Sequence, residues 1–81
     1  MPKSIYSREQ RKLIALLREA REDAGMTQTK LAAKLKRPQS FVSKYETGER
    51  RLDLVELRVI CKALGISLVD FVGRFDKAAS R

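Results

Sequence analysis

The chain has 81 residues, and its 18 Lys and Arg against 10 Asp and Glu give a formal net charge of +8. A chain of this length forms one domain, and a basic excess this large makes polyanions such as nucleic acid the expected partners. The single cysteine and the absence of histidine exclude a disulfide framework and a thiolate metal cluster, and they remove the commonest general base.

The first predicted helix begins near Ser7 and ends at Gly25. Ser7 and Gln10 have the spacing of a capping box, in which a serine and a residue three positions later cap the first turn. The apolar residues at helical spacing are Leu13, Leu16, Leu17, Ala20 and Ala24. Gly25 follows them, as is usual where a helix ends in a left-handed residue. We expect residues 1–7, which precede this pattern, to be flexible.

Two short helices are predicted next. Thr27 is a favourable N-cap for a helix that runs to about Leu35. Pro38 is excluded from a helix interior but favoured in a first turn, so it marks the start of a third helix that ends near Glu46. The apolar positions are Leu31, Ala32 and Leu35 in the first segment and Phe41, Val42 and Tyr45 in the second.

The same signals predict two more helices. Asp53 and Glu56 form a capping-box pair, and Gly65 ends the helix that follows them. Ser67 begins the last helix. The apolar positions are Leu54, Leu57, Ile60, Cys61 and Leu64 in the fourth segment and Leu68, Phe71, Val72 and Phe75 in the fifth. No segment alternates with period two, so we predict an all-α fold of five helices over residues 8–75, with flexible residues 76–81.

Residues 28–48 predict a helix-turn-helix, in which two short helices are joined by a tight turn and the second can lie in a DNA major groove. If Ala32 and Val42 face inward where these helices cross, the polar residues of the second helix face outward. Those polar residues are Gln39, Ser40, Ser43 and Lys44. Glutamine can pair with adenine, lysine can donate to guanine and serine can bond to either, so all four are candidate base contacts.

The basic excess is concentrated around this motif. Seven Lys and Arg but only two Glu occur between Thr27 and Leu52. Gln28 stands at a helix start, where free backbone amides and the helix dipole favour a phosphate. Arg37, in the turn, and Arg50, beyond the third helix, are further candidate phosphate contacts.

The pattern resembles the phage-repressor-like helix-turn-helix family, of the Cro and xenobiotic-response-element (XRE) type. The matching residues are Gly25-Met26-Thr27-Gln28, Leu31-Ala32, Leu35, Gln39-Ser40, Val42-Ser43, Tyr45-Glu46, Gly48, Leu54, Leu57, Ile60, Leu64, Gly65 and Phe71. The match covers about residues 8–74 and implies a compact five-helix domain like that of lambda repressor. It also implies that Gln39, Ser40 and Lys44 occupy positions that touch bases, and that Gln28 contacts the DNA backbone.

Two structural details follow from the resemblance. The family often pairs an arginine at the position of Arg21 with a glutamate at that of Glu46, which would join the first helix to the end of the third. The chain departs from the family at Lys36, where the turn usually contains glycine. If Lys36 has a positive φ, the lysine costs about 1 kcal/mol relative to glycine.

Several apolar residues have alternative interpretations. Phe41 either meets a thymine methyl or the sugar-phosphate wall, or packs against the turn. We expect Tyr45 to belong to the core with its hydroxyl near the surface, and Cys61 to be a buried small apolar residue. The last helix has more apolar residues than one monomer needs, so we predict a dimer interface containing Val69, Val72 and Phe75, with Val55 or Val59 contributing.

The sequence therefore predicts a sequence-specific DNA-binding transcriptional regulator, a dimeric repressor that reads a palindromic operator on double-stranded DNA. An alternative remains open, namely an antitoxin-like or anti-regulator subunit whose main partner is another protein, such as a toxin. No catalytic constellation, metal site or cofactor is predicted, so we expect no enzymatic activity. Charges interrupt every apolar stretch well before the ~18 residues of a membrane span, and no secretory signal is evident, so we expect a cytoplasmic protein.

Overall fold

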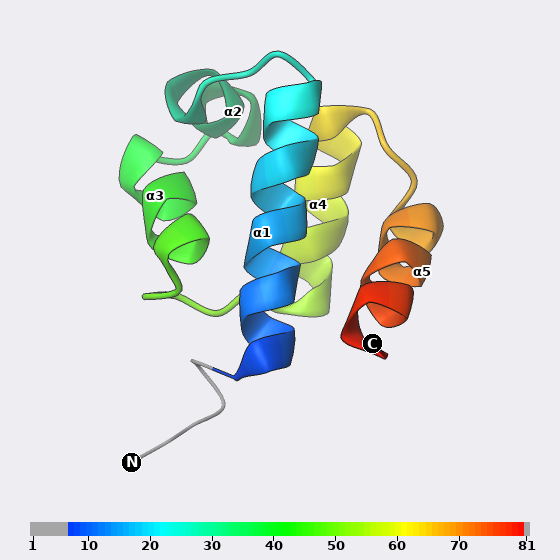
Figure 1. Cartoon of the computed structure of the whole chain (residues 1–81). Helices are drawn as coiled ribbons and strands as arrows, with labels where there is room; N and C mark the ends of the chain where they lie inside the picture. The colour runs from blue at the N-terminus through cyan, green and yellow to red at the C-terminus, as the bar shows by residue number, and fades with distance from the viewer. Residues whose placement is uncertain (1–6, 81) are drawn as a thin grey trace.

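The computed structural model describes residues 7–80 and folds them into five α-helices, with no strand in that range (Figure 1). The helices are α1 (Arg8–Asp23), α2 (Gln28–Leu35), α3 (Gln39–Thr47), α4 (Leu54–Leu64) and α5 (Leu68–Ala79). The predicted all-α fold is confirmed. The expected flexibility of residues 1–6 and 81 concerns positions outside the described part of the chain.

Helix α1 occupies the centre of the domain, with α2 and α3 on one side and α5 on the other (Figure 1). It packs against both α3 and α5, while α4 packs against α2 and α5. α2 and α3 also pack directly on each other across their short connection. The helix-turn-helix unit therefore rests on α1 and α4, which fix its position in the domain.

Side chains cap four of these five helix starts. The capping residues are Ser7, Thr27, Asp53 and Ser67, and each accepts a hydrogen bond from the amide three residues later. At Asp53 the reciprocal bond from Glu56 is also present, so the predicted capping box forms there. Pro38 occupies the cap position of α3 without a side-chain bond. Gly48 ends α3 with φ of 87°, and a Cβ there would lie 3.4 Å from Cδ1 of Ile14.

Helix α5 extends past Phe75, where the predicted domain boundary lies, and residues 76–79 are helical rather than loose. Two contacts with α1 account for the difference. The Lys12 ammonium donates to the carbonyl oxygen of Ala78, and Arg74 forms an ion pair of 3.0 Å with Glu19. A cation at the carbonyl end of a helix also interacts favourably with the helix dipole. The sequence pattern missed the extension because both contacts join residues distant in sequence.

All five helices contribute to one hydrophobic core. Its buried residues are Leu17, Ala20, Leu31, Ala32, Phe41, Val42, Tyr45, Ile60, Cys61, Leu64 and Phe71. Cys61 is buried as predicted, and its burial raises the pKa of the thiol. Phe41 is also buried and meets Tyr45 edge-to-face, with ring centroids 5.5 Å apart. The structure therefore favours the packing interpretation of Phe41 over contact with a thymine methyl.

The hydroxyl of Tyr45 does not lie near the surface, contrary to our expectation. The residue is 1% exposed, and its hydroxyl is buried with no hydrogen-bond partner in the described residues. Burial raises the pKa of this phenol because the phenolate would have to be desolvated. The core thus contains one polar atom whose desolvation no hydrogen bond offsets.

Replacing Tyr45 with phenylalanine should raise the free energy of unfolding by about 1 kcal/mol, because the change removes an unsatisfied buried hydroxyl and keeps the ring. Urea unfolding at neutral pH measures the change. The folded state keeps this phenol neutral, whereas in the unfolded chain it ionises near its ordinary pKa of about 10. The free energy of unfolding of the wild type should therefore not change with the ionisation of Tyr45 below about pH 10 and should fall above it. Tyr45→Phe should therefore lose less stability in alkali than the wild type, and an equal loss would contradict the burial argument.

The turn between α2 and α3 retains the backbone conformation of glycine while containing lysine. Lys36 has φ of 57° and ψ of 41°, and it is the only non-glycine residue with positive φ among residues 7–80. Its amide donates to the Ala33 carbonyl at 3.1 Å, and the Arg37 amide donates to that of Ala32 at 3.0 Å. These two bonds end α2 in the way a glycine would.

Lys36→Gly should raise the free energy of unfolding by about 1 kcal/mol, because glycine adopts this conformation without the steric penalty of a Cβ. The matched control is Gly65→Ala, which places a Cβ at a φ of 74° with no neighbour within 4 Å and should lower stability by a similar amount. Chemical denaturation of both variants measures the effects. If Lys36→Gly lost stability, strain at Lys36 would be ruled out.

Candidate nucleic-acid interface

The two edges of α3 differ sharply in exposure. Phe41, Val42 and Tyr45 face the core and are buried. On the outer edge, Gln39, Ser40 and Lys44 are exposed and Ser43 is half-buried. Because an α-helix repeats every 3.6 residues, these spacings place the polar side chains together along one side. The helix therefore presents a polar edge that ends in a lysine.

Close packing between α2 and α3 fixes the direction of that edge. Ala32 is 2% exposed and Val42 is fully buried, so both lie inside the helix-turn-helix unit. The small side chain of Ala32 lets the two helices approach, and Val42 fills the space between α3 and its neighbours. A rotation of α3 about its axis would expose Val42, so the packing fixes which residues face outward.

A buried ion pair joins α1 to the end of α3. Arg21 donates to both oxygens of Glu46, from Nε at 2.8 Å and from Nη2 at 3.1 Å. Its Nη1 also donates to the carbonyl oxygen of Met26 at 2.7 Å, beside the start of α2. The hydrogen bond to Glu46 raises the pKa of Arg21 despite the opposing effect of burial. The pair that the family resemblance implies is thus present and spans three segments of the chain.

Two glutamines extend this pair to the surface. Gln28 Nε2 donates to Glu46 Oε1 at 3.0 Å, and Gln39 Nε2 donates to Gln28 Oε1 at 2.8 Å. A continuous chain of hydrogen bonds therefore runs from the buried Arg21 to the exposed side chain of Gln39. Such a chain restricts the rotamers of both glutamines before any ligand arrives.

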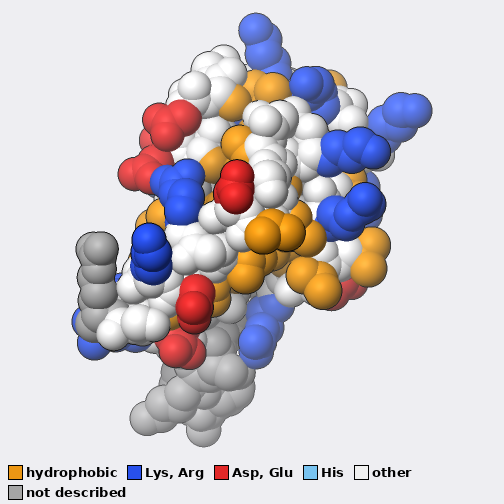
Figure 2. All heavy atoms as spheres, turned by 90° about the vertical axis from the view of Figure 1, so that its right-hand side faces the viewer, with side chains coloured by type: hydrophobic (Ala, Val, Ile, Leu, Met, Phe, Trp, Pro, Cys, Tyr) orange, Lys and Arg blue, Asp and Glu red, His pale blue; other side chains and the backbone are white. Residues whose placement is uncertain are grey.

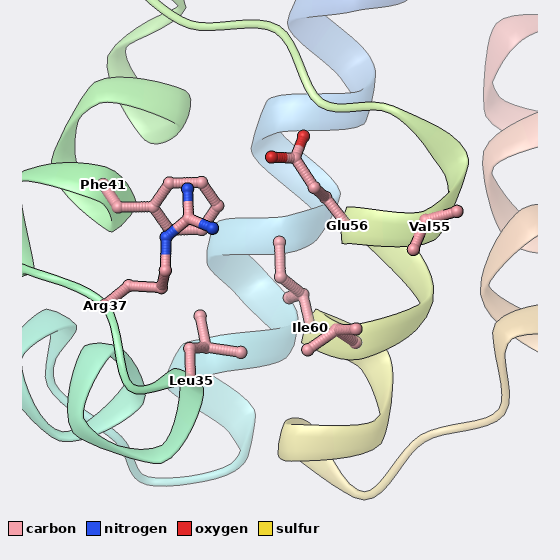
Figure 3. Close-up of a pocket in the computed structure, with 7 residues that line it drawn as sticks. Leu35, Arg37, Phe41, Val55, Glu56 and Ile60 are labelled. Carbon is pink, nitrogen blue, oxygen red and sulfur yellow. The ribbon is translucent and has the colours of Figure 1, made fainter.

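Two arginine side chains stack against Phe41 at the other side of α3, and Figure 3 shows that of Arg37 over the ring. The guanidinium carbon of Arg37 lies 4.1 Å from the ring centroid, and that of Arg50 lies 4.8 Å from it. Arg50 also donates to Glu56 of α4 through Nη1 at 3.1 Å and Nη2 at 2.7 Å. This contact, together with the Asp53 amide, lowers the pKa of Glu56 because both stabilise the carboxylate.

Sequence reasoning assigned Glu56 only to a helix cap and did not link it to Arg50. It also missed the stacking of two arginines on Phe41 and the bond between Gln28 and Gln39. No periodicity relates the residues of a loop to those of the next helix, so spacing could not have found these contacts. The excess of basic residues around Phe41 was the one available signal.

A second surface feature lies on α4 and α5, where hydrophobic side chains gather at the surface (Figure 2). The exposed large hydrophobic residues are Leu54, Val55, Val59, Val69 and Val72. Of the three predicted dimer residues, Val69 is 79% exposed, Val72 is 41% exposed and Phe75 is half-buried. Val69 and Val72 are exposed on the same helix, and a cluster of exposed apolar side chains is typical of a protein interface.

Within residues 7–80, no group of three or more acidic, cysteine or histidine side chains is arranged to hold a metal ion. None of the helices in the same range has the length and apolar character needed to cross a bilayer.

The fold and the exposed edge of α3 define a helix-turn-helix domain of the DNA-binding class. A family model described as helix-turn-helix matches residues 17–71. The chain belongs to the XRE-type helix-turn-helix family of DNA-binding transcriptional regulators.

Solved structures from this family are closely similar. An XRE-family like protein from Pseudomonas syringae pv. tomato str. DC3000 is 43% identical over 94% of this chain and 93% of its own, with a TM-score of 0.85. The restriction-modification controller protein C.Esp1396I, as a tetramer in complex with its natural 35 base-pair operator, is 29% identical over 93% and 99%, with a TM-score of 0.82. The clp gene regulator ClgR from C. glutamicum is 28% identical over 88% and 91%, with a TM-score of 0.76. No match was found among curated protein sequences.

Breaking the buried ion pair should strongly destabilise the domain. Glu46→Ala leaves the Arg21 guanidinium buried without its carboxylate, so we expect a loss of about 3 kcal/mol in the free energy of unfolding. Glu22→Ala is the matched control, because it removes the exposed partner of Arg18 at 3.4 Å and should change stability by less than about 0.5 kcal/mol. Denaturant titration distinguishes the two, and similar losses would mean that burial of the pair has no special effect.

Proposed function

We propose that this protein is a cytoplasmic repressor without enzymatic activity that binds a palindromic operator as a homodimer. Membership of the XRE-type family supports regulation through DNA. The observation that carries the proposal is the fixed polar edge of α3, where Gln39, Ser40 and Lys44 are exposed while Val42 is fully buried. An edge of this kind is suited to the major groove, where side chains can reach base edges.

Gln39 and Lys44 are the main base-reading residues in this proposal, with Ser40 and Ser43 as adaptable contacts. Gln39 uses one N–H to bond Gln28, which leaves its carbonyl oxygen and a second N–H for a base. One acceptor and one donor are the groups that glutamine presents to the N6 and N7 edge of adenine. Lys44 is a flexible donor suited to guanine O6 and N7.

The backbone contacts of the proposal lie at both ends of this edge. The first amides of α2 at Gln28 have no partner within the helix, and together with the helix dipole they favour a phosphate. Arg37 is exposed in the turn, and Arg50 lies beside it on the same aromatic ring. Each phosphate that these groups neutralise should contribute about −0.9 to the dependence of log K on log salt concentration.

Dimerisation would occur through the apolar surface of α5, with Val69 and Val72 at its centre and Phe75 at its side. The tetramer of C.Esp1396I on its operator supports assembly of several copies on DNA in a relative of the same fold. A two-fold dimer places the α3 helices of its two copies on half-sites about 34 Å apart, which requires an approximately palindromic operator.

Selection of preferred duplexes from a random pool tests the function directly. The expected result is a consensus with two-fold symmetry, bound more tightly than mixed-sequence DNA and weakened steeply by salt. A pool that yields no preferred sequence would refute sequence-specific regulation. A preferred sequence without symmetry would refute the dimeric form of the proposal while retaining sequence-specific binding.

Substitutions separate base contacts from phosphate contacts. Lys44→Ala should lose about 1–3 kcal/mol of binding free energy for the selected duplex and relax the preference at one base position. Arg37→Ala should weaken binding to selected and mixed duplexes by the same factor. Lys77→Ala is the control, since it removes a cation from α5, the helix on the opposite side of α1 from α3 (Figure 1). If Lys44→Ala and Arg37→Ala both acted uniformly on all duplexes, α3 would not be the reading element.

A further inference from the structure

We propose that Glu56, an acidic residue, increases affinity for DNA by positioning Arg50 against a phosphate. The inference rests on the proposed DNA-binding function and adds to it a residue that itself touches no DNA. Glu56 lies in the first turn of α4, opposite Phe41 of α3 and Arg37 (Figure 3).

The two hydrogen bonds between Arg50 and Glu56 use one edge of the guanidinium. Nη1 and Nη2 donate to the two carboxylate oxygens at 3.1 and 2.7 Å, and Nη1 also donates to the Arg51 carbonyl at 3.0 Å. A guanidinium has five N–H groups in a planar fork. The Nε–H and the second N–H of Nη2 remain, and both lie on the other edge of the plane. Two parallel donors on one edge match two oxygens of a phosphate.

The aromatic ring restricts Arg50 in the direction that Glu56 does not. Its guanidinium carbon lies 4.8 Å from the centroid of Phe41, which is itself buried and held edge-to-face by Tyr45. The carboxylate of Glu56 therefore holds the guanidinium through its Nη1 and Nη2 groups, and the ring of Phe41 packs against its flat face. A side chain held in this way loses less conformational freedom on binding than a free surface arginine.

Glu56 also offsets the repulsion between two neighbouring cations. Arg37 stacks on the same ring at 4.1 Å, and it contributes with Arg50 to the lowered pKa of Glu56. Without a carboxylate beside them, two guanidinium groups on one ring would repel each other. The anion thus lets a pair of phosphate-binding cations occupy one small area of the surface.

The carboxylate is itself held to the protein. Its Oε1 accepts from the Asp53 amide at 3.0 Å, and the Glu56 amide donates to Asp53 Oδ1 at 2.7 Å. The positive end of the α4 dipole adds to this restraint. Glu56 is half-buried and engaged on the protein side, so its charge is directed toward Arg50 and away from an approaching duplex.

The test is whether neutralising Glu56 strengthens or weakens binding to DNA. Removing an acidic residue from a polyanion-binding surface ordinarily strengthens binding, because a repulsive charge is lost. If Glu56 positions Arg50, Glu56→Gln should instead weaken binding to a short mixed-sequence duplex about three- to tenfold. The magnitude of the salt slope should also fall by roughly 0.9, the contribution of one phosphate contact.

Three further variants define the comparison. Arg50→Gln should reduce the salt slope by the same amount, and the double variant should reduce it no further. Glu49→Gln is the charge-matched control. Glu49 is exposed and accepts a hydrogen bond from the Thr47 hydroxyl. The Glu49→Gln variant should bind DNA more tightly than the wild type, because it only loses a negative charge. Glu56→Asp retains the charge but shortens the side chain, so it should also weaken binding. Circular dichroism at the assay temperature verifies that each variant is folded.

The inference is overturned if Glu56→Gln binds the mixed duplex as tightly as the wild type, or more tightly, with an unchanged salt slope. The same result for Glu56→Asp would overturn it even if Glu56→Gln were too unstable to assay. A wild-type chain that binds no duplex at all would refute the proposed function itself, which is a separate outcome from a wild type that binds and a variant that does not weaken.

Discussion

The buried ion pair between Arg21 and Glu46 is the interaction on which the arrangement of the helix-turn-helix depends. It joins α1 to the end of α3, and Arg21 also reaches the carbonyl of Met26 beside the start of α2. Removing two charges from water is unfavourable unless hydrogen bonds offset the lost hydration. Arg21 makes three such bonds, and Gln28, itself bonded to Gln39, adds another to Glu46. A requirement of the core thus orients side chains at the surface.

The other side of α3 is organised by a different kind of contact. There the ring of Phe41 belongs to the core, and Arg37 from the turn and Arg50 from the following loop cover it. The two networks differ in burial, since the arginine on α1 is almost inaccessible to solvent and Arg50 is partly open. The first network is therefore almost closed to solvent, and the second leaves its cations accessible at the surface.

Residues that act through local spacing were predictable from sequence, and residues that act through tertiary contact were not. Helix boundaries followed from Ser, Thr and Asp caps, and the inward position of Val42 followed from helical periodicity. The roles of Phe41 and Glu56 depend on α3 and α4 facing each other across a loop, which no local pattern specifies. The same applies to residues 76–79, whose helical structure depends on Lys12 and Glu19 of α1. The predicted position of the Tyr45 hydroxyl was wrong for a related reason, because the depth of a side chain depends on the packing of the whole core.

The central position of α1 has a consequence for the distance allowed between two DNA half-sites. One side of α1 contacts α3 and the other is fastened to α5 by Lys12 and by the pair of Glu19 with Arg74. If two copies associate through α5, the packing of α5 on α1 and of α1 on α3 in each copy sets the separation of the two α3 helices. One base pair inserted between half-sites rotates them by about a tenth of a turn about the duplex axis. Because packed helices resist displacement, we expect bending or twisting of the DNA to absorb such an insertion.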